Sequence, residues 1–378
     1  MKVNTMGLRT WIEVDRKAIK HNYHLFRTLI PKKTKLMAVV KSNAYGHSLL
    51  DFAKETEKLG VDFIGVDSMV EALALRREGI KAPILVLGYT LPEWLSEAAQ
   101  QNISVTVSQF ETLEAIKKTK FPSPLKIHIK VDTGMHRQGF LLSQQKPLVS
   151  IVKGQLSNVQ IEGLYTHFAS AKNPAFPHDT QAQIRNFKVW IDAFKKAGFK
   201  PIVHAAATAG ALLFPESHFD MVRVGIGLYG LWPAKEVKAF LSDKIKLKSA
   251  MTWKTIISEI KTVPKGARVG YDLTEQLDRV STIAVCPVGY WHGYPRSLSS
   301  IGRVMVGGKE CKVLGRVSMD MLTIDVSGVK KSQVGDEVII LGPDGDSPVS
   351  AEGISRLTDD SWYEVVTCLN PLIKRIYT

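Results

Sequence analysis

Residues 35–66 read KLMAVVKSNAYGHSLLDFAKETEKLGVDFIGV, in which two short apolar runs flank a helical pattern. The runs are Lys35–Val40 and Val61–Val66, and the segment LLDFAKETEKLG between them has its apolar positions on one face of a helix. Gly60 closes this helical pattern, as glycine commonly does. A strand, a helix and a strand in this order predict a βαβ unit with parallel strands.

The same alternation continues through the first two-thirds of the chain. Further helical patterns are SMVEALALRREG (68–79), SQFETLEAIKKT (108–119) and TQAQIRNFKVWIDAFKKAG (180–198). A doubly wound open sheet would alternate in this way too, but a count of eight strands favours a parallel (β/α)8 barrel. The eight candidate strands are Lys35–Val40, Val61–Val66, Pro83–Leu87, Ile103–Val107, Leu125–Val131, Val159–Tyr165, Pro201–His204 and Met221–Gly225.

The pattern changes near Ser249, after which strand-like runs follow one another without long helices between them. Only Ser350–Leu357 is predicted to be helical in this part. We therefore expect an α/β chain with a (β/α)8 barrel at 1–245 and a mainly β domain at 246–378, against which residues 1–12 are expected to pack. The predicted strands are Trp253–Val263, Val280–Val285, Val304–Val306, Lys312–Val317, Leu322–Val326 and Glu337–Leu341.

Composition limits the classes of function. The 378 residues are 45% hydrophobic and 23% charged, which is typical of a globular protein and excludes a disordered or fibrous one. Three widely spaced cysteines exclude a disulfide framework, and no apolar run is long enough to cross a membrane. The net charge of +14 comes from scattered cations without a nucleic-acid motif. We expect a cytoplasmic protein that binds an anionic small ligand, not nucleic acid, a membrane or a metal.

In a (β/α)8 barrel the active site lies where the strands end, and the first strand ends at Lys41. Burial lowers the pKa of a lysine and makes its amine available as a nucleophile or base. A surface lysine at a strand end is the alternative interpretation, but the following Asn43, Tyr45 and His47 make a polar loop.

Two later strands also end in polar side chains. After the fifth strand, Lys130, Asp132 and Arg137 follow one another, and the arginine could hold a carboxylate or a phenolate oxygen. A surface ion pair between Asp132 and Arg137 is equally compatible with the spacing. The sixth strand ends at His167, which on its own is more often structural than catalytic.

The last two strands end in segments rich in small residues, which carry Thr208 after one and Gly225-Ile226-Gly227 after the other. Loops at these positions of a barrel commonly bind phosphate through backbone N–H groups. A lysine beside a phosphate site predicts a pyridoxal phosphate Schiff base, and a phosphosugar aldolase with a Schiff-base lysine stays open on the residues alone.

The segment at residues 38–48, AVVKSNAYGHS, resembles the cofactor-lysine motif of the alanine racemases. These are pyridoxal phosphate enzymes with a barrel and a β domain. The resemblance runs over nearly the whole chain, and the segments in the second domain exclude the shorter barrel-only pyridoxal phosphate carriers. The other matching segments are HIKVDTGMHRQGF, GLYTHFASA, MVRVGIGLYG, PVGYWHGYPR, VLGRVSMDM and WYEVVTCLN.

The resemblance implies that Lys41 binds pyridoxal 5'-phosphate and acts as a base on one face of the substrate α-carbon. Tyr271 would act on the opposite face, with its basicity supported through His167 and Arg223. Arg223 would also face the pyridine nitrogen of the cofactor, and Arg137 would contact its phenolic oxygen and the substrate carboxylate.

The resemblance further implies that Lys130 is carbamylated, which turns a competing cation into an anion that orients Arg137. Cofactor contacts are implied for Lys41, Tyr45, Arg137, His167, Thr208, Arg223, Gly225, Ile226 and Tyr363. Substrate contacts are implied for Arg137, Tyr290, Met319 and Asp320.

In this family Tyr271 and the entrance residues come from the partner subunit, so the resemblance implies a homodimer with shared active sites. The expected reaction is the interconversion of L- and D-alanine by two-base proton transfer on a pyridoxal phosphate aldimine, which supplies D-alanine for peptidoglycan. A racemase with another or broader amino acid range, a related amino acid decarboxylase and a pyridoxal phosphate carrier stay open. Three departures from the family pattern bear on selectivity, namely Ala207 before Thr208, Trp291-His292, and Asp272-Leu273 after Tyr271.

Overall fold

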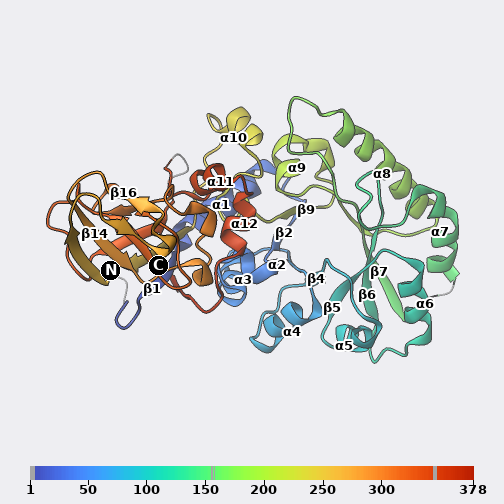
Figure 1. The fold of residues 1–378 in the computed structure, drawn as a ribbon. Helices are drawn as coiled ribbons and strands as arrows, with labels where there is room; N and C mark the ends of the chain where they lie inside the picture. The colour runs from blue at the N-terminus through green and yellow to red at the C-terminus, as the bar shows by residue number, and fades with distance from the viewer. Residues whose placement is uncertain (1–4, 155, 157, 344–346) are drawn as a thin grey trace. The chain divides into compact units, whose positions relative to one another are not determined.

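A computed structural model describes residues 5–154, 156, 158–343 and 347–378 of the chain (Figure 1). Residues 1–4 of the predicted N-terminal segment lie outside the described residues. The chain divides into two compact units. A barrel unit contains Ile19–Ala44 and Leu49–Leu247, and a β unit contains Tyr45–Ser48, Lys248–Thr378 and the chain up to Ala18. In the described ranges no helix has the length and apolar character needed to cross a membrane.

The barrel unit is built on eight parallel strands that close into a ring, as predicted. Closure is made by β2, which pairs with β3 on one side and with β9 on the other. Every residue of β3 and β5 is buried, because strands of a parallel barrel are covered on both faces. The strands are β2 (Lys35–Val39), β3 (Phe63–Val66), β4 (Ile84–Val86), β5 (Ile103–Val107), β6 (Leu125–Lys130), β7 (Val159–Tyr165), β8 (Ile202–His204) and β9 (Met221–Val224).

Helices α4 to α8 lie outside this ring of strands (Figure 1). The four predicted helical patterns are confirmed as α3, α4, α6 and α8. Helix α4 begins where the Ser68 side chain accepts a hydrogen bond from the backbone N–H of Glu71, a typical N-cap. The helices of this part of the chain are α1 (Arg16–Leu29), α2 (Lys41–Tyr45), α3 (Leu49–Lys58), α4 (Met69–Arg77), α5 (Leu95–Gln100), α6 (Phe110–Lys118), α7 (Gln145–Gly154), α8 (His178–Lys196), α9 (Thr208–Leu213) and α10 (Lys235–Leu241), with 3-10 turns η1 (Pro92–Trp94), η2 (Leu142–Gln144) and η3 (Pro215–Ser217).

The β unit contains a nine-stranded sheet in the order β11-β14-β17-β16-β15-β18-β10-β1-β19, and a separate β12-β13 pair. The N-terminal strand β1 lies between β10, to which it is antiparallel, and the C-terminal strand β19, to which it is parallel. The strands are β1 (Thr10–Val14), β10 (Met251–Ile256), β11 (Glu259–Val263), β12 (Arg268–Val269), β13 (Glu275–Gln276), β14 (Ser281–Cys286), β15 (Arg303–Val306), β16 (Lys309–Leu314), β17 (Leu322–Asp325), β18 (Glu337–Leu341) and β19 (Lys374–Tyr377).

Two sequence-based expectations for the β unit were wrong. The predicted single strand Trp253–Val263 is two strands, because β10 pairs with β18 whereas β11 pairs with β14. Besides the predicted helix, observed as α11 (Ala351–Thr358), the unit contains a second helix, α12 (Trp362–Thr367). The Ser361 side chain caps α12 by accepting from the Tyr363 N–H. The unit also contains the 3-10 turns η4 (Tyr271–Leu273), η5 (Tyr290–His292) and η6 (Arg296–Leu298).

Candidate active site

Lys41 follows β2 at the carboxyl end of the barrel and opens an unusual turn. The backbone of Ser42, Asn43 and Ala44 is left-handed, with φ of 56°, 55° and 51°. Non-glycine residues adopt this conformation at a cost of roughly 1–2 kcal/mol each. A run of three such residues therefore needs strong local support, and the neighbouring loops provide it.

Two side chains from the barrel unit hold this turn. The carboxylate of Glu71 accepts from the backbone N–H of Ser42 and from that of Asp67, each at 2.7 Å. Asn43 Oδ1 accepts from the backbone N–H of Leu49 at 3.0 Å. The Nζ of Lys41 then lies 3.1 Å from Asp67 Oδ1, in a partly exposed ion pair. The lysine thus projects from a fixed backbone at the mouth of the barrel.

Arg223, on β9, is the most connected side chain of the barrel interior. It is 3% exposed, and its Nη2 donates to the carbonyl oxygens of Thr166 and Ala205 at 2.9 and 2.8 Å. The same Nη2, whose two hydrogens are shared among three acceptors, also donates to Nδ1 of His167 at 3.2 Å, and Nη1 donates to Nδ1 of His204 at 2.9 Å. Since a guanidinium has no acceptor, both histidine Nδ1 atoms must be unprotonated.

A chain of hydrogen bonds leads from Arg223 to an anion. His204 Nε2 lies 2.9 Å from His128 Nδ1, and His128 Nε2 lies 3.0 Å from Glu162 Oε2. Burial is the main reason that the pKa values of His128 and His204 are lowered, so both rings are neutral. Each neutral ring then accepts on one nitrogen and donates from the other, and the chain has one direction, from the arginine to the glutamate.

Several cations gather around His167 and Lys130. Burial, and then the charges of Arg223, Arg137, Lys130 and Lys41, lower the pKa of His167 to about 3. Burial, and then the charges of Arg137, Arg223 and Lys41, lower the pKa of Lys130 to about 8. The Nζ of Lys130 donates to Gln138 Oε1 at 2.8 Å, a neutral partner that leaves the positive charge uncompensated. The cluster is suited to receive anions.

Arg137 lies in the loop after β6 and is exposed. Within the described ranges no ion pair joins it to Asp132, so the surface ion pair considered above is not formed. The Asp132 carboxylate instead accepts from the backbone N–H groups of Gly134 and Met135 at 2.8 and 3.0 Å. This leaves the guanidinium of Arg137 available to a ligand.

The loops after β8 and β9 are joined through Thr208. Its Oγ1 accepts from the backbone N–H groups of Gly225 and Gly227 at 3.3 and 3.4 Å. A Cβ atom added at Gly227 would lie 2.5 Å from the Phe26 ring and 2.8 Å from Thr208 Cγ2, so only glycine fits there. Thr208, Gly225 and Ile226 are buried, so the predicted phosphate segment is a compact backbone turn.

Within the β unit, Tyr45 lies beside Tyr363 of α12, with ring centroids 6.1 Å apart. Burial raises the pKa of Tyr45 to about 12 and raises that of Tyr363 as well, so both phenols keep their protons. Gly46 follows at φ +83°, and an added Cβ there would lie 2.0 Å from the carbonyl oxygen of Val366. The position of Tyr45 beside Tyr363 therefore depends on a close approach of two backbone segments, at which only glycine fits.

Tyr290 and Met319 lie on two adjoining loops of the β unit. The backbone N–H of Tyr290 donates to the carbonyl of Ser318 at 3.0 Å, and that of Trp291 donates to the carbonyl of Met319 at 3.0 Å. Tyr290 and Met319 are exposed, and the exposed Asp320 follows Met319 on its loop. These predicted entrance residues are thus brought together.

Tyr271 is the first residue of η4 and is 69% exposed. It follows Gly270, whose φ of +82° a side chain would not favour. The next residue, Asp272, is also left-handed, and its carboxylate lies 3.1 Å from Arg316 Nε. Tyr271 therefore lies exposed on a turn whose conformation is fixed by Gly270 before it and by the Asp272–Arg316 ion pair after it.

The structure thus places the predicted residues in two sets. The barrel unit carries Lys41, Lys130, Arg137, His167, Thr208, Arg223, Gly225 and Ile226, and the β unit carries Tyr45, Tyr271, Tyr290, Met319, Asp320 and Tyr363. Sequence reasoning missed His204, His128 and Glu162 as members of the Arg223 network. Charged and imidazole side chains inside apolar strands, as in LKIHIK and VQIEGLY, were the available signal.

Comparisons with known proteins show the family to which the chain is similar. Two family models match, "Alanine racemase, N-terminal domain" over residues 14–233 and "Alanine racemase, C-terminal domain" over residues 250–377. Alanine racemase 2 of Oceanobacillus iheyensis is 38% identical over 97% of this chain and 93% of its own length. Alanine racemase of Methanococcus maripaludis is 38% identical over 97% of this chain and 98% of its own length.

Solved structures are similar over the same extent. Alanine racemase of Clostridium difficile 630 gives a TM-score of 0.92 at 31% identity and covers 98% of this chain and 96% of its own. Alanine racemase of Bacillus anthracis with bound L-Ala-P gives 0.91 at 35% identity and covers 98% of this chain and 95% of its own. Together with the two family models, these similarities show that the chain belongs to the alanine racemase family of isomerases.

Proposed function

We propose that this chain interconverts L- and D-alanine, with pyridoxal phosphate bound to Lys41 and one proton-transferring group on each face of the substrate α-carbon. The observation that carries the proposal is the contact of Arg223 with a neutral His167 inside a cluster of cations. Bound pyridoxal phosphate supplies an electron sink that makes the α-proton of an amino acid removable.

The residues of the chain fit this cofactor. Its phosphate needs anion-binding groups, and we place it on the turn formed by Thr208, Gly225 and Ile226, where the backbone N–H groups of Gly225 and Gly227 already converge on the Thr208 hydroxyl. Tyr45 and Tyr363 keep their protons and so act as hydrogen-bond donors to phosphate oxygens. Ile226 belongs to the same turn, and Lys41 holds the aldehyde carbon.

Arg223 faces the pyridine nitrogen in this proposal. Its charge is fixed in place by two carbonyl groups and two histidines, so it cannot turn away or give up its proton at neutral pH. A permanent cation there disfavours protonation of the ring nitrogen. A weaker electron sink suppresses side reactions such as transamination and favours return of the proton to the α-carbon.

Racemisation needs a proton to leave one face of the α-carbon and another to arrive on the opposite face. We assign these two roles to Lys41 and Tyr271. His167 accepts from Arg223 at Nδ1, so its Nε2 carries the hydrogen and can donate to the Tyr271 oxygen. Such a donor stabilises the tyrosinate form, which a free phenol with a pKa near 10 hardly populates at neutral pH.

Arg137 holds the substrate carboxylate, and Lys130 is carbamylated in our proposal. A carbamate at Lys130 is an anion in contact with a cationic cluster, and it replaces a charge that opposes Arg137 by one that orients it. Carbamylation requires the neutral amine, and the lowered pKa of Lys130 increases the fraction of that form.

We infer that the active enzyme is a homodimer in which Tyr271, Tyr290, Met319 and Asp320 complete the site of the partner subunit. In the single chain the loops of the β unit expose six large apolar side chains, and exposed apolar patches are typical of interaction surfaces. Backbone hydrogen bonds and the Asp272–Arg316 ion pair hold these loops in place. The exposed side chains are Tyr271, Leu273, Tyr290, Trp291, Met319 and Met321.

The presence of Tyr363, as the resemblance to the family implies, favours a small substrate such as alanine, whose D-form would serve peptidoglycan synthesis in the cytoplasm. Chiral chromatography of L-alanine incubated with the holoenzyme tests this directly, and accumulation of D-alanine is expected. Several D-amino acids from a mixed pool would instead indicate a broader racemase. No D-amino acid from a protein that still binds the cofactor would favour a decarboxylase or a carrier and contradict the role of Tyr271.

A mixing experiment tests the shared sites. Lys41→Ala and Tyr271→Phe homodimers are each expected to be inactive, with Tyr89→Phe, another exposed tyrosine, as the active control. In a heterodimer with shared sites, one site has both lysine and tyrosine intact, so an equal mixture recovers about a quarter of the parent activity. If each chain formed its own site, the mixture would stay inactive.

A further inference from the structure

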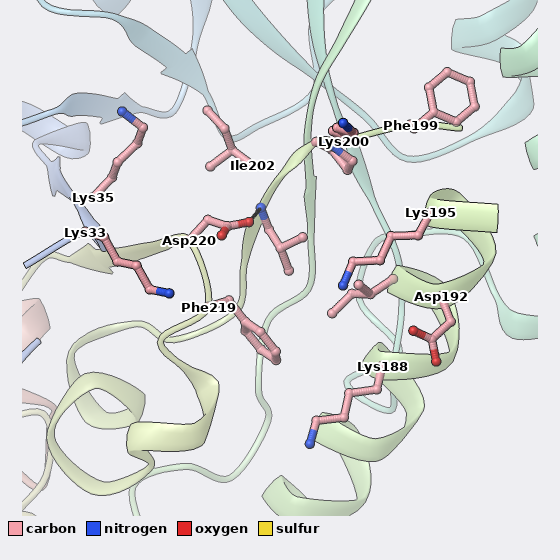
Figure 2. A pocket seen from close by; sticks show the side chains of 13 residues that line it. Lys33, Lys35, Lys188, Asp192, Lys195, Phe199, Lys200, Ile202, Phe219 and Asp220 are labelled. Atoms are coloured by element: carbon pink, nitrogen blue, oxygen red, sulfur yellow. Dashed lines mark hydrogen bonds between the residues drawn. The ribbon is translucent and has the colours of Figure 1, made fainter. Parts of the chain in front are cut away.

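A pocket of about 740 Å³ lies at the amino-terminal end of the barrel strands, within the barrel unit (Figure 2). Its lining includes Lys35, the first residue of β2, Ile202, the first residue of β8, and Asp220, just before β9. Lys41 follows the opposite end of β2, so at ~3.3 Å per strand residue the two regions are roughly 20 Å apart along the strand. The pocket is therefore separate from the candidate active site.

Five lysines and two carboxylates line this pocket, so its net charge is positive. Helix α8 contributes Lys188 and Lys195, whose spacing of seven residues places them on one face of the helix. In Figure 2 the ammonium groups of Lys33 and Lys195 extend into the pocket from opposite walls, on either side of Phe219. The remaining charged lining residues are Lys35, Lys200, Asp192 and Asp220.

The positive charge is not neutralised by the protein. Among the residues that the structure describes, no ion pair or side-chain hydrogen bond involves any of the five ammonium groups. The Asp220 carboxylate is directed to the backbone, where it accepts from the N–H of Val203 at 2.9 Å. Elsewhere on the barrel unit, lysines such as Lys54, Lys58 and Lys117 do pair with glutamates. The gathering of five such lysines around one hollow therefore distinguishes this region.

The pocket also has an apolar surface. Phe199, Ile202 and Phe219 line it and are half-buried, and Pro201 completes this surface. Phe219 is held edge-on against Phe187 of α8, with ring centroids 5.5 Å apart. A volume of this size is in the range of small-molecule sites, and lysines bind phosphate groups as point charges.

From this combination we infer that the pocket binds an organic polyanion, with phosphate groups on the lysines and an apolar or aromatic body against Phe199 and Phe219. An inorganic anion would use the charge but not the apolar surface, and an apolar ligand would leave the net positive charge of the lining uncompensated. The proposal also gives a local role to part of the +14 charge, which racemisation does not use.

Calorimetry with the pyridoxal phosphate-saturated holoenzyme tests the proposal, because the cofactor then occupies the active-site phosphate position. ATP serves as the probe. Tripolyphosphate, which has only its phosphate groups, and adenosine, which has only its base and sugar, are tested separately. We expect saturable binding of ATP at one site per chain, weakened by added salt, with tripolyphosphate bound at least fivefold more weakly and adenosine not measurably bound. Equal affinity for ATP and tripolyphosphate would overturn the assignment of an organic ligand.

A matched pair of variants locates the binding. Lys33→Glu/Lys195→Glu is expected to weaken ATP binding at least tenfold. Lys118→Glu/Lys146→Glu makes the same change in net charge at exposed positions away from the pocket. This control pair is expected to change the affinity for ATP less than twofold. Equal weakening by both pairs would mean diffuse attraction to a basic protein, and no saturable binding to the parent would mean no site; either result overturns the proposal. Racemase activity within twofold of the parent in both pairs checks that they fold.

Discussion

Arg223 Nη2 donates a hydrogen bond to Nδ1 of His167 across 3.2 Å, and this contact fixes the protonation of the histidine. Because Nδ1 accepts, the single hydrogen of the neutral ring is on Nε2, where it can serve an oxygen acceptor. The arginine is itself anchored by carbonyl groups and by a chain of two further histidines that ends at Glu162. The tautomer of His167 thus depends on residues deep inside the barrel.

Replacing Arg223 by lysine should lower kcat more than it raises KM. A lysine ammonium is a single nitrogen without the planar fork by which Nη1 and Nη2 reach His204 and His167, and hydrogen bonds to charged groups contribute about 1.5–3 kcal/mol each. We expect a loss of roughly 10- to 100-fold in kcat, measured by alanine racemisation. Arg185→Lys, an exposed position on α8, is the control and should match the parent. An unchanged kcat in Arg223→Lys would contradict the role assigned to the Arg223–His167 contact.

The stability of the protein should fall as the pH is lowered from 7 to 5. The pKa of His167 is lowered to about 3, and those of His128 and His204 are lowered as well. The unfolded chain, with histidine pKa values near 6.5, therefore binds more protons than the folded one in this range, and stability rises with pH. The shift at His167 contributes about 2 kcal/mol to the difference in the free energy of unfolding between pH 7 and pH 5.

Urea unfolding of His167→Asn at both pH values measures one of these contributions. The variant should lose about 2 kcal/mol less than the parent on acidification, because asparagine does not titrate. His178→Asn, at an exposed position, is the control and should behave as the parent does. A variant whose pH dependence equals that of the parent would show that His167 is not held neutral.

Lys130 should take up carbon dioxide more readily than an ordinary lysine. With a pKa of about 8, roughly a tenth of its amines are neutral at pH 7, compared with ~0.03% at the usual pKa. After incubation with ¹³C-bicarbonate at pH 8, NMR should detect one carbamate signal per chain, which disappears on acidification. Lys146→Ala should keep the signal and Lys130→Ala should lose it; a signal that survives in Lys130→Ala belongs to another lysine.

Gly46→Ala should destabilise the protein far more than the same change at Gly266. The two glycines have nearly the same φ, +83° and +85°, so the backbone strain of an alanine is similar, about 1–2 kcal/mol. Only at Gly46 does the added Cβ meet a backbone atom, the Val366 oxygen, and overpacking of this kind costs about 1–3 kcal/mol more. Urea unfolding of both variants measures the difference, and equal losses would mean that the Val366 contact is relieved without cost.

The barrel could be predicted because its strands are buried on both faces and so appear as continuous apolar runs between helical patterns. Helix α12 could not, since Val365, Val366 and Thr367 are β-branched and favour a strand locally. Burial of Val365 and Val366 in the folded unit overrides that preference. For this segment the local propensity points to a strand, but tertiary packing decides that it forms a helix.

Some of the site residues could be found from the sequence, and others are brought together only by the fold. Lys41 stands out because a charged side chain at the end of an apolar strand is visible in the sequence, whereas the role of Arg223 follows only from the resemblance to the family. The link from His204 to His128 depends on the strand order around the closed barrel, which no local pattern contains. The lysine pocket is likewise assembled from separate segments, among them Lys33 before β2 and Lys195 on α8.

The position of β1 bears on how the chain can be divided. This strand, from the first fifteen residues, lies between β10 and the C-terminal strand β19, and Tyr45–Ser48 also belongs to the β unit. A fragment that starts at Lys248 therefore lacks an interior strand of its own sheet, and β19 has no neighbour to pair with. Each of the two family models covers one continuous segment of sequence, whereas the β unit is made of residues from both ends of the chain. A gene divided at residue 247 is therefore expected to give no C-terminal domain that folds on its own.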